Sequence, residues 1–291
     1  MFFNPKHHEH LDVEIASYIV SKFREVLGGT EVFVQHLPSI LAACENPHSI
    51  LTFMFNTTQE VWAMPQTNQM WLEFYLLENR VEDICHTITY SYRDEVGLEL
   101  RHPDRTINKS FVMIEWERKG NFELLIKTIT ELVFAIGFDT IVEVNYEDVC
   151  KEFGVTIIDD SIEKQLNSRY NADVVLLKYF PERTHPFWNM EYDQNVRAFK
   201  KVDVIINGEE CGGGAERSTD RYLQHSRFYS IENGEYSKTL FDKFGMERVQ
   251  KELNKYLDLT FFERIGMGWG LSRLVKAVKN KMNKDNITVL L

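Results

Sequence analysis

The chain has 291 residues, a formal net charge of −11, 44% hydrophobic residues and 26% charged residues. This length and composition are those of a globular protein that can bury a large core, and they exclude a disordered or collagen-like chain. The acidic balance argues against an extended nucleic-acid surface, which requires clustered Lys and Arg. No apolar run approaches the ~18 residues that span a bilayer, and the start of the chain lacks the apolar segment of a signal peptide. We therefore expect a cytoplasmic protein without a membrane partner.

The spacing of cysteines and glycines excludes several common kinds of site. The four cysteines lie far apart without a Cys-x-x-Cys pair, which indicates reduced thiols and neither a zinc site nor a disulfide framework. No Gly-x-x-x-x-Gly-Lys-Ser/Thr sequence and no Gly-x-Gly-x-x-Gly after a strand occur. P-loop and Rossmann sites therefore have no support.

The first predicted elements are a helix and a strand. Apolar residues recur at every fourth position from Leu11 to Leu27 and are followed by two glycines, which predicts an amphipathic helix over residues 11–27. Residues 31–38 are rich in strand-forming residues and end at Pro38. This pattern predicts a strand that stops at the proline.

Two alternating strands are predicted within residues 80–117. In the first strand, the polar side chains Thr87, Thr89 and Ser91 lie on one face, and Arg93 is the last residue of that face. In the second, the side chains expected to face a core are Val112, Ile114 and Trp116, and those expected to face the other way are Phe111, Met113, Glu115 and Glu117. The basic loop between the strands suits a polyphosphate. An ordinary antiparallel sheet with one face in water gives the same alternation.

The second half of the chain contains a core helix, a buried strand and two glycine-rich segments. Residues 122–136 have apolar side chains at helical spacing, and residues 174–177 form a short apolar run. Asp203 and Glu210 lead toward a glycine-rich bend, and two carboxylates suit Mg²⁺ that is shared with phosphates. Alternate glycines before a helix that carries Arg273 are, on their own, typical of a glycine loop with a surface arginine.

Together these stretches resemble the class II aminoacyl-tRNA synthetases, most closely the asparaginyl and aspartyl branch. Residues 92–117 resemble motif 2, residues 266–274 resemble motif 3, and the first helix and strand are similar to motif 1, through which two subunits pair. The resemblance implies an α+β protein with an antiparallel six- to seven-stranded sheet flanked by helices. It also implies ATP as a substrate, Mg²⁺ as a cofactor and a homodimer.

The resemblance assigns an ATP site. Its residues are Arg93, Glu95, Arg101, His102, Phe111 and Arg273. Arg93 and Arg273 would be the catalytic residues, on the α-phosphate and along the triphosphate, and Phe111 would stack on adenine. The loop before Phe111 is longer than in the family, so Arg105 is an alternative to Arg101 for the far phosphates.

The resemblance also assigns an amino-acid site and a metal site. The substrate-binding residues are Glu45, Gln69, Glu73, Gly213, Gly214 and Arg217, and the metal ligands are Asp203 and Glu210. Glu45 and Gln69 would hold the α-amino group, and Arg217 would read the side chain. Leu72-Glu73 follows the asparaginyl pattern, although packing on a helix face is the alternative for Glu73. Ala215-Glu216 departs from the family, where serine or glycine precedes glutamine.

The asparaginyl and aspartyl synthetases carry an N-terminal β-barrel, an OB-fold, that reads the anticodon, and the resemblance does not extend to such a domain. We therefore expect a single catalytic domain over residues 1–291 and no charging of tRNA. The expected function is an ATP-dependent ligase that adenylates aspartate, asparagine or a close analogue. The acyl group would pass to ammonia or another small amine, as in stand-alone asparagine synthetases. Three alternatives are a compact synthetase that esterifies tRNA, an enzyme that charges a carrier protein, and an inactive regulatory paralogue that binds ATP or an amino acid.

Overall fold

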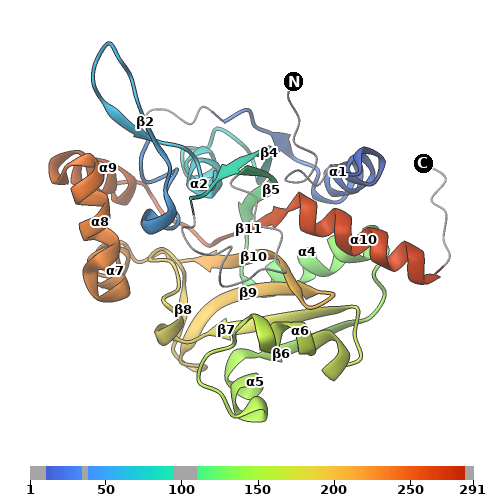
Figure 1. Ribbon diagram of the computed structural model, residues 1–291. Coiled ribbons are helices and arrows are strands. Elements are labelled where there is room, and N and C mark those ends of the chain that lie inside the picture. The colour runs from blue at the N-terminus through green and yellow to red at the C-terminus, as the bar shows by residue number, and fades with distance from the viewer. Residues whose placement is uncertain (1–10, 35–38, 95–109, 286–291) are drawn as a thin grey trace.

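The computed structural model describes residues 11–34, 39–94 and 110–285. A nine-stranded sheet runs through it, with helices on both faces (Figure 1). In spatial order its strands are β1 (Thr30–Glu31), β4 (Ile84–Tyr92), β5 (Ser110–Lys119), β11 (Arg264–Gly270), β10 (Glu209–Arg217), β9 (Ala198–Ile206), β7 (Val174–Phe180) and β6 (Ile141–Asn145), with β8 (Tyr192–Asp193) paired to β9. Glu95, Arg101, His102 and Arg105 lie outside the described residues, so their roles stay predictions.

The predicted sheet is corrected in two respects. It was expected to be antiparallel with six or seven strands, whereas the sheet has nine strands and is mixed. The pairs β1/β4 and β6/β7 are parallel. Between β6 and β7 the chain forms α5 (Tyr146–Phe153) and α6 (Asp160–Arg169), and such a crossover joins parallel strands because a short hairpin turn cannot. The short, polar helices of this region gave no clear periodicity in the sequence.

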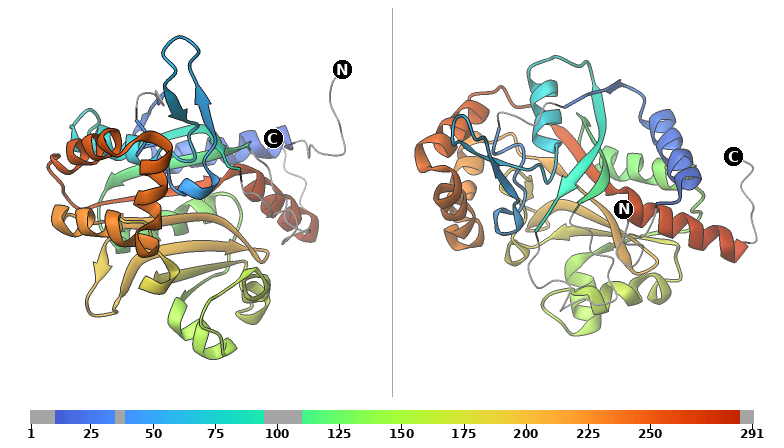
Figure 2. Two further views of the ribbon diagram at one scale, coloured as in Figure 1. Left: turned by 60° about the vertical axis from the view of Figure 1, so that its left-hand side comes forward. Right: turned by 45° about the horizontal axis from the view of Figure 1, so that its top comes forward.

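One face of the sheet packs against α1 (Val13–Leu27), α4 (Phe122–Ala135) and α10 (Leu271–Asp285). The Asp12 side chain accepts a hydrogen bond from the Ile15 N–H at the start of α1, and Gly28 with φ 56° ends it. Ile114 and Trp116 of β5 are buried in this core, as the alternation predicted. The helices predicted over residues 11–27 and 122–136 are thereby confirmed, and α1 and α10 lie side by side (Figures 1 and 2).

The strand predicted over residues 31–38 is wrong in its extent. Only Thr30–Glu31 form β1, which pairs with Cys85 and His86 of β4. The Val32 N–H still bonds to the His86 carbonyl at 2.8 Å, but residues 32–34 belong to no strand. Residues 35–38 lie outside the described part of the chain.

The other face of the sheet is covered at its two ends and leaves a cleft between them. Helix α2 (Gln69–Leu77) packs over β4 and β5, while α5 packs over β6 and β7 and α6 packs over β7, β9 and β10. The remaining helices and short helical turns of the described residues are α7 (Arg221–Ser230), α8 (Glu235–Phe244), α9 (Met246–Leu257), η1 (Pro47–Ser49), η2 (Glu182–Thr184) and η3 (Ile231–Gly234). A separate hairpin, β2 (Thr52–Met54) and β3 (Val61–Ala63), projects from the body of the molecule (Figure 2). None of the described helices is both long and apolar enough to cross a bilayer.

The glycine-rich bend predicted after Glu210 is not a bend. Residues 212–214 lie inside β10, and the turn of the β9–β10 hairpin is Asn207-Gly208, with φ of 54° and 73°. The glycines are needed in the strand because β11 approaches closely. A Cβ at Gly214 would lie 2.8 Å from the Gly266 carbonyl oxygen. The alternate glycines 266–270 likewise belong to a strand, β11, and not to a loop.

Candidate active site

A cleft with a volume of about 330 Å³ opens on the face between α2 and the α5–α6 pair. It brings together most of the described residues that were predicted for the site: Glu45, Gln69, Arg93, Phe111, Asp203, Glu210, Gly213, Gly214, Arg217 and Arg273. A smaller pocket, lined also by Glu73, shares the walls formed by Glu45, Gln69 and Arg217. Segments from both ends of the chain therefore form one cavity, and Arg93 and Arg273 both line it.

Arg93 lies directly after β4, and Glu45 and Phe111 are among its neighbours in the cleft. Its Nη2 is 2.6 Å from Glu45 Oε2, and its guanidinium lies 5.6 Å from the centre of the Phe111 ring. The side chains of Arg93 and Glu45 are 27% and 49% exposed. An ion pair this open to water contributes little to stability, so each partner can be given up to a charged ligand at small cost.

Gln66, which the sequence did not single out, fixes the position of Glu45. The buried Gln66 Oε1 accepts hydrogen bonds from the backbone N–H groups of Glu45 and Asn46, at 3.0 and 2.8 Å. The backbone carbonyl oxygen of Gln66 accepts a hydrogen bond from the Ser91 hydroxyl of β4 at 2.7 Å. The segment that carries Glu45 is thus tied to the strand that ends at Arg93. Nothing in the single sequence distinguishes Gln66 from the nearby Gln69.

Glu115 of β5 has an equivalent role for Gln69. This fully buried carboxylate accepts hydrogen bonds from the Thr67 hydroxyl and from the backbone and side-chain nitrogens of Asn68, the latter two at 2.9 and 2.8 Å. Burial raises the pKa of Glu115. These bonds hold the start of α2, so that Gln69 lines the cleft.

Asp203 of β9 and Glu210 of β10 face the same point of the cleft. A Cβ built on Gly213 would lie 2.9 Å from Asp203 Oδ1 and 3.4 Å from Glu210 Oε1. Asp203 is 7% exposed, its Oδ2 accepts the Lys201 ammonium at 2.8 Å, and its Oδ1 has no hydrogen-bond partner among the described residues. Burial is the main cause that raises the pKa of Asp203 to about 7.

The chemistry of these two acids fits Mg²⁺. They supply oxygen atoms beside a glycine that leaves room for an ion, and Mg²⁺ is usually held by one or two carboxylates together with substrate phosphates and water. Within the described ranges, no group of three or more His, Cys, Asp or Glu side chains forms a complete metal cage. The four cysteines, all described, are free and buried.

Arg273 enters the cleft from the first turn of α10. Its Nη1 donates a hydrogen bond to the Glu210 carbonyl oxygen, and its Nε lies 3.8 Å from Glu209 Oε1. Lys276, one turn further along α10, is 3.2 Å from Glu209 Oε2. Two cations of one helix are therefore anchored at the turn end of β10, beside the acid pair.

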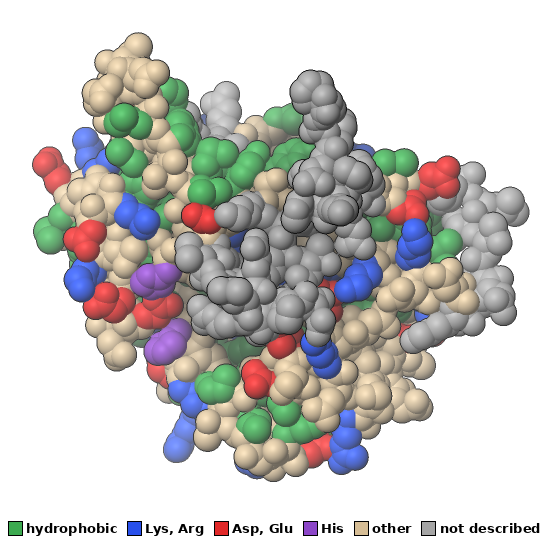
Figure 3. Space-filling model, viewed as in Figure 1, with side chains coloured by type: hydrophobic (Ala, Val, Ile, Leu, Met, Phe, Trp, Pro, Cys, Tyr) green, Lys and Arg blue, Asp and Glu red, His purple; other side chains and the backbone are tan. Residues whose placement is uncertain are grey.

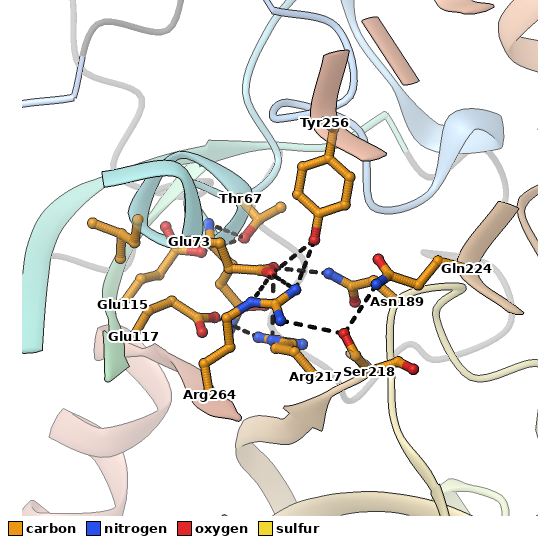
Figure 4. Close-up of polar contacts among 12 residues, drawn as sticks. Thr67, Glu73, Glu115, Glu117, Asn189, Arg217, Ser218, Gln224, Tyr256 and Arg264 are labelled. Carbon is orange, nitrogen blue, oxygen red and sulfur yellow. Dashed lines mark hydrogen bonds and ion pairs between the residues drawn. The ribbon is translucent and has the colours of Figure 1, made fainter. Parts of the chain in front are cut away.

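Glu73 belongs to a buried network of hydrogen bonds (Figure 4). It is fully buried and accepts hydrogen bonds from Arg264 Nε at 2.8 Å, Tyr256 Oη at 2.9 Å and Asn189 Nδ2 at 2.8 Å. Arg264 also donates to the carbonyl of Ser218. The carboxylate of Glu73 is thus already held by donors of the chain itself, so its contact with a substrate stays a prediction.

Arg217 connects this network to the cleft. Its Nη2 is 2.6 Å from Glu117 Oε1 and its Nε is 3.7 Å from Glu73 Oε1, with all three side chains almost completely buried. Burial raises the pKa of Glu117. Gly266 makes room for Glu117, since a Cβ there would lie 1.8 Å from Glu117 Oε1. Recognition of the substrate's side chain by Arg217 stays a prediction.

The departure from the family at Glu216 involves a side chain of the sheet's other face. Glu216 accepts hydrogen bonds from the Phe122 N–H at 2.6 Å and from Lys200 Nζ at 2.9 Å. It therefore anchors the start of α4 and has no place in the cleft.

On the face of the molecule shown in Figure 3, the described acidic and basic side chains are interspersed and not separated by sign.

Comparisons with known proteins place the chain in a family. A model of the tRNA synthetases class II (D, K and N) matches residues 2–289. An aspartate–tRNA ligase from Lactobacillus johnsonii is 28% identical over 113 residues, which is 36% of this chain and 17% of the ligase.

Two solved structures have a similar fold. Asparaginyl-tRNA synthetase from Pyrococcus horikoshii, complexed with asparaginyl-adenylate, superimposes with a TM-score of 0.69 at 17% identity, over 91% of this chain and 64% of that one. Aspartyl-tRNA synthetase from Entamoeba histolytica gives a TM-score of 0.65 at 16% identity, over 92% and 55% of the two chains. The chain thus spans less than two thirds of these relatives. It belongs to the class II tRNA synthetases of the D, K and N group and has their α+β fold.

Proposed function

We propose that the protein is an ATP-dependent ligase that activates aspartate, asparagine or a close analogue as an aminoacyl-adenylate. The observation that carries the proposal is the single cleft lined by Arg93, Arg273 and the Asp203–Glu210 acid pair. Membership of the D, K and N group and similarity to a synthetase solved with asparaginyl-adenylate support the same chemistry.

The reaction is an attack by the substrate carboxylate on the α-phosphorus of ATP. A carboxylate oxygen forms the new bond to phosphorus, the bond to the bridging oxygen breaks, and pyrophosphate leaves. No protein nucleophile is needed, so the protein contributes positioning and charge neutralisation. Arg93 would neutralise the α-phosphate and Arg273 the leaving pyrophosphate. Asp203 and Glu210 would hold Mg²⁺, which would supply positive charge beside the phosphates.

The Arg93–Glu45 pair would exchange its partners when substrates bind. The α-ammonium group of an amino acid is a cation that replaces Arg93 at Glu45, and the phosphate or carboxylate is an anion that replaces Glu45 at Arg93. Both groups are exposed enough for this exchange, at 27% and 49%. Gln66 holds the Glu45 backbone in place throughout, so the exchange requires side-chain movement only.

For the acceptor we propose ammonia or another small amine, with the catalytic domain acting as a homodimer. The acidic balance of the chain, −11, favours a small acceptor over an RNA, whose phosphates require basic surface. Transfer to tRNA or to a carrier protein is an alternative. Light scattering tests the dimer, and a monomer at micromolar concentration would contradict it.

The activation step is tested by ATP–pyrophosphate exchange with each of the twenty amino acids in turn. We expect exchange that depends on aspartate, asparagine or a close analogue. If no amino acid stimulates exchange, the ligase proposal fails, and ATP binding without exchange would indicate a regulatory role. Incubation of the labelled active amino acid with ammonium, RNA or total protein then identifies the acceptor by where the label appears.

A further inference from the structure

Lys201 is a partly buried cation of the cleft that the proposed reaction does not use. It lies on β9 two residues before Asp203, so both side chains project from the same face of the strand. Its ammonium is 2.8 Å from Asp203 Oδ2 and 3.9 Å from the centre of the Phe180 ring. Its side chain is 25% exposed and lines the cleft.

The position of Lys201 is that of a counter-ion for the acid pair. Asp203 Oδ2 is occupied by the ammonium, while Asp203 Oδ1 is buried and has no partner among the described residues. Glu210 Oε1 and Asp203 Oδ1 face one point beside Gly213. Two carboxylates close together at a partly buried site repel each other, and a single positive charge at this point relieves that repulsion.

A divalent cation and the Lys201 ammonium compete for the Asp203 carboxylate. A metal bound between Asp203 and Glu210 brings two positive charges next to the ammonium, and like charges so close together repel each other strongly in a partly buried site. Metal binding is therefore opposed as long as Lys201 stays on Asp203. An anionic ligand in the cleft removes this opposition, since it offers the ammonium another partner.

We propose that Lys201 is an internal competitor of the divalent cation, so that the acid pair accepts metal readily only when an anionic substrate draws the ammonium away from Asp203. The proposal rests on the proposed function, because it takes Asp203 and Glu210 as the metal ligands. It adds a regulation of that site: metal and nucleotide enter together, and the ligand-free protein binds metal weakly.

The neighbouring Lys200 provides a matched control. It carries the same charge one residue earlier on the same strand, but it points to the opposite face and pairs with Glu216 at 2.9 Å. A general change in net charge affects metal binding equally in variants of both lysines. Competition for Asp203 affects it only in variants of Lys201.

The test is Mn²⁺ binding to the nucleotide-free protein, followed by the loss of the electron paramagnetic resonance signal of free Mn²⁺. Lys201→Met keeps the length of the side chain and its packing on Phe180, and Lys201→Gln is a second neutral variant in case the first is poorly folded. We expect both to bind Mn²⁺ about tenfold more tightly than wild type, or more. Lys200→Met should bind like wild type, and adding Asp203→Asn to Lys201→Met should abolish the gain.

Equal Mn²⁺ affinity in wild type and both Lys201 variants would overturn the proposal, as would an equal gain in Lys200→Met. These measurements contain no ATP and no amino acid. Failure of the competition is thus distinguished from failure of the ligase function, which is measured separately by pyrophosphate exchange in the wild-type protein.

Discussion

Two arginine–glutamate pairs of nearly equal length differ in what they do for the protein. Arg264 and Glu73 are 2.7 Å apart with both side chains fully buried, whereas Arg93 and Glu45 are 2.6 Å apart with 27% and 49% of their side chains exposed. A buried pair cannot lose one partner without leaving an unpaired charge in a medium of low dielectric constant. An exposed pair can exchange its partner for water or a ligand. Burial, and not distance, therefore separates the supporting network from the reactive cleft.

The largest effect is expected from breaking the buried pair. Arg264→Met should lower the free energy of unfolding by about 3–5 kcal/mol, because Glu73 would keep a buried charge without its main partner. Urea unfolding followed by circular dichroism measures the loss. If the loss is below ~1 kcal/mol, Glu73 is not held as a charge by Arg264 and the comparison fails.

Breaking the cleft pair should affect chemistry instead of stability. Arg93→Ala should reduce kcat/KM for pyrophosphate exchange by roughly 10²–10³-fold, the usual cost of removing one group that stabilises developing charge. Its unfolding free energy should change by less than ~1 kcal/mol, since the pair is exposed. A variant with near-normal exchange would show that Arg93 does not contact the reacting phosphate.

A smaller effect is expected when space in the cleft is removed without removing a charge. In Gly213→Ala the new methyl group would lie 2.9 Å from Asp203 Oδ1 and 3.4 Å from Glu210 Oε1, so the Asp203 carboxylate must shift. We expect the Mg²⁺ concentration for half-maximal exchange to rise roughly tenfold, as is typical when the surroundings of a metal ligand are disturbed. An unchanged Mg²⁺ requirement would argue against this acid pair as the metal site.

The smallest effect is expected from a third arginine–glutamate pair, on the surface. Arg24 Nη2 and Glu31 Oε1 are 2.7 Å apart with 50% and 32% of their side chains exposed. Arg24→Met should cost less than ~1 kcal/mol of unfolding free energy at pH 7. The hydrogen bond from Arg24 lowers the pKa of Glu31 below 4.5, so this contribution is present above pH 4.5 and disappears as the pH falls through the lowered pKa. Urea unfolding at pH 7 and at stepwise lower pH values checks both points, and a difference that does not shrink as the pH falls would contradict the ion-pair explanation.

The resemblance to the synthetase family supplied most of the cleft residues, and the strict alternation of the strands predicted the face on which their side chains lie. Along β5 the apolar side chains Ile114 and Trp116 are in the core, and Phe111 lines the cleft, as expected. Prediction was poorest between residues 140 and 170, where α5 and α6 are short and mostly polar. The glycine-rich segment after Glu210 was predicted to bend, and the alternate glycines 266–270 taken alone were typical of a loop, although the two segments form adjacent strands, β10 and β11. Single-sequence reasoning associates glycine with turns, and only the pairing of the two strands shows why the side chains are absent.

The sequence alone determined the periodic elements and the face of each strand, because these follow from neighbours within a few positions along the chain, and the resemblance to the synthetase family supplied most of the charged residues of the cleft. The tertiary structure decided which charged side chains are buried and which are exposed to solvent. Glu73 and Arg264 are 191 positions apart, and nothing local marks them as partners. Burial depends on how distant segments pack, and burial determines whether an ion pair supports the fold or remains available to a substrate.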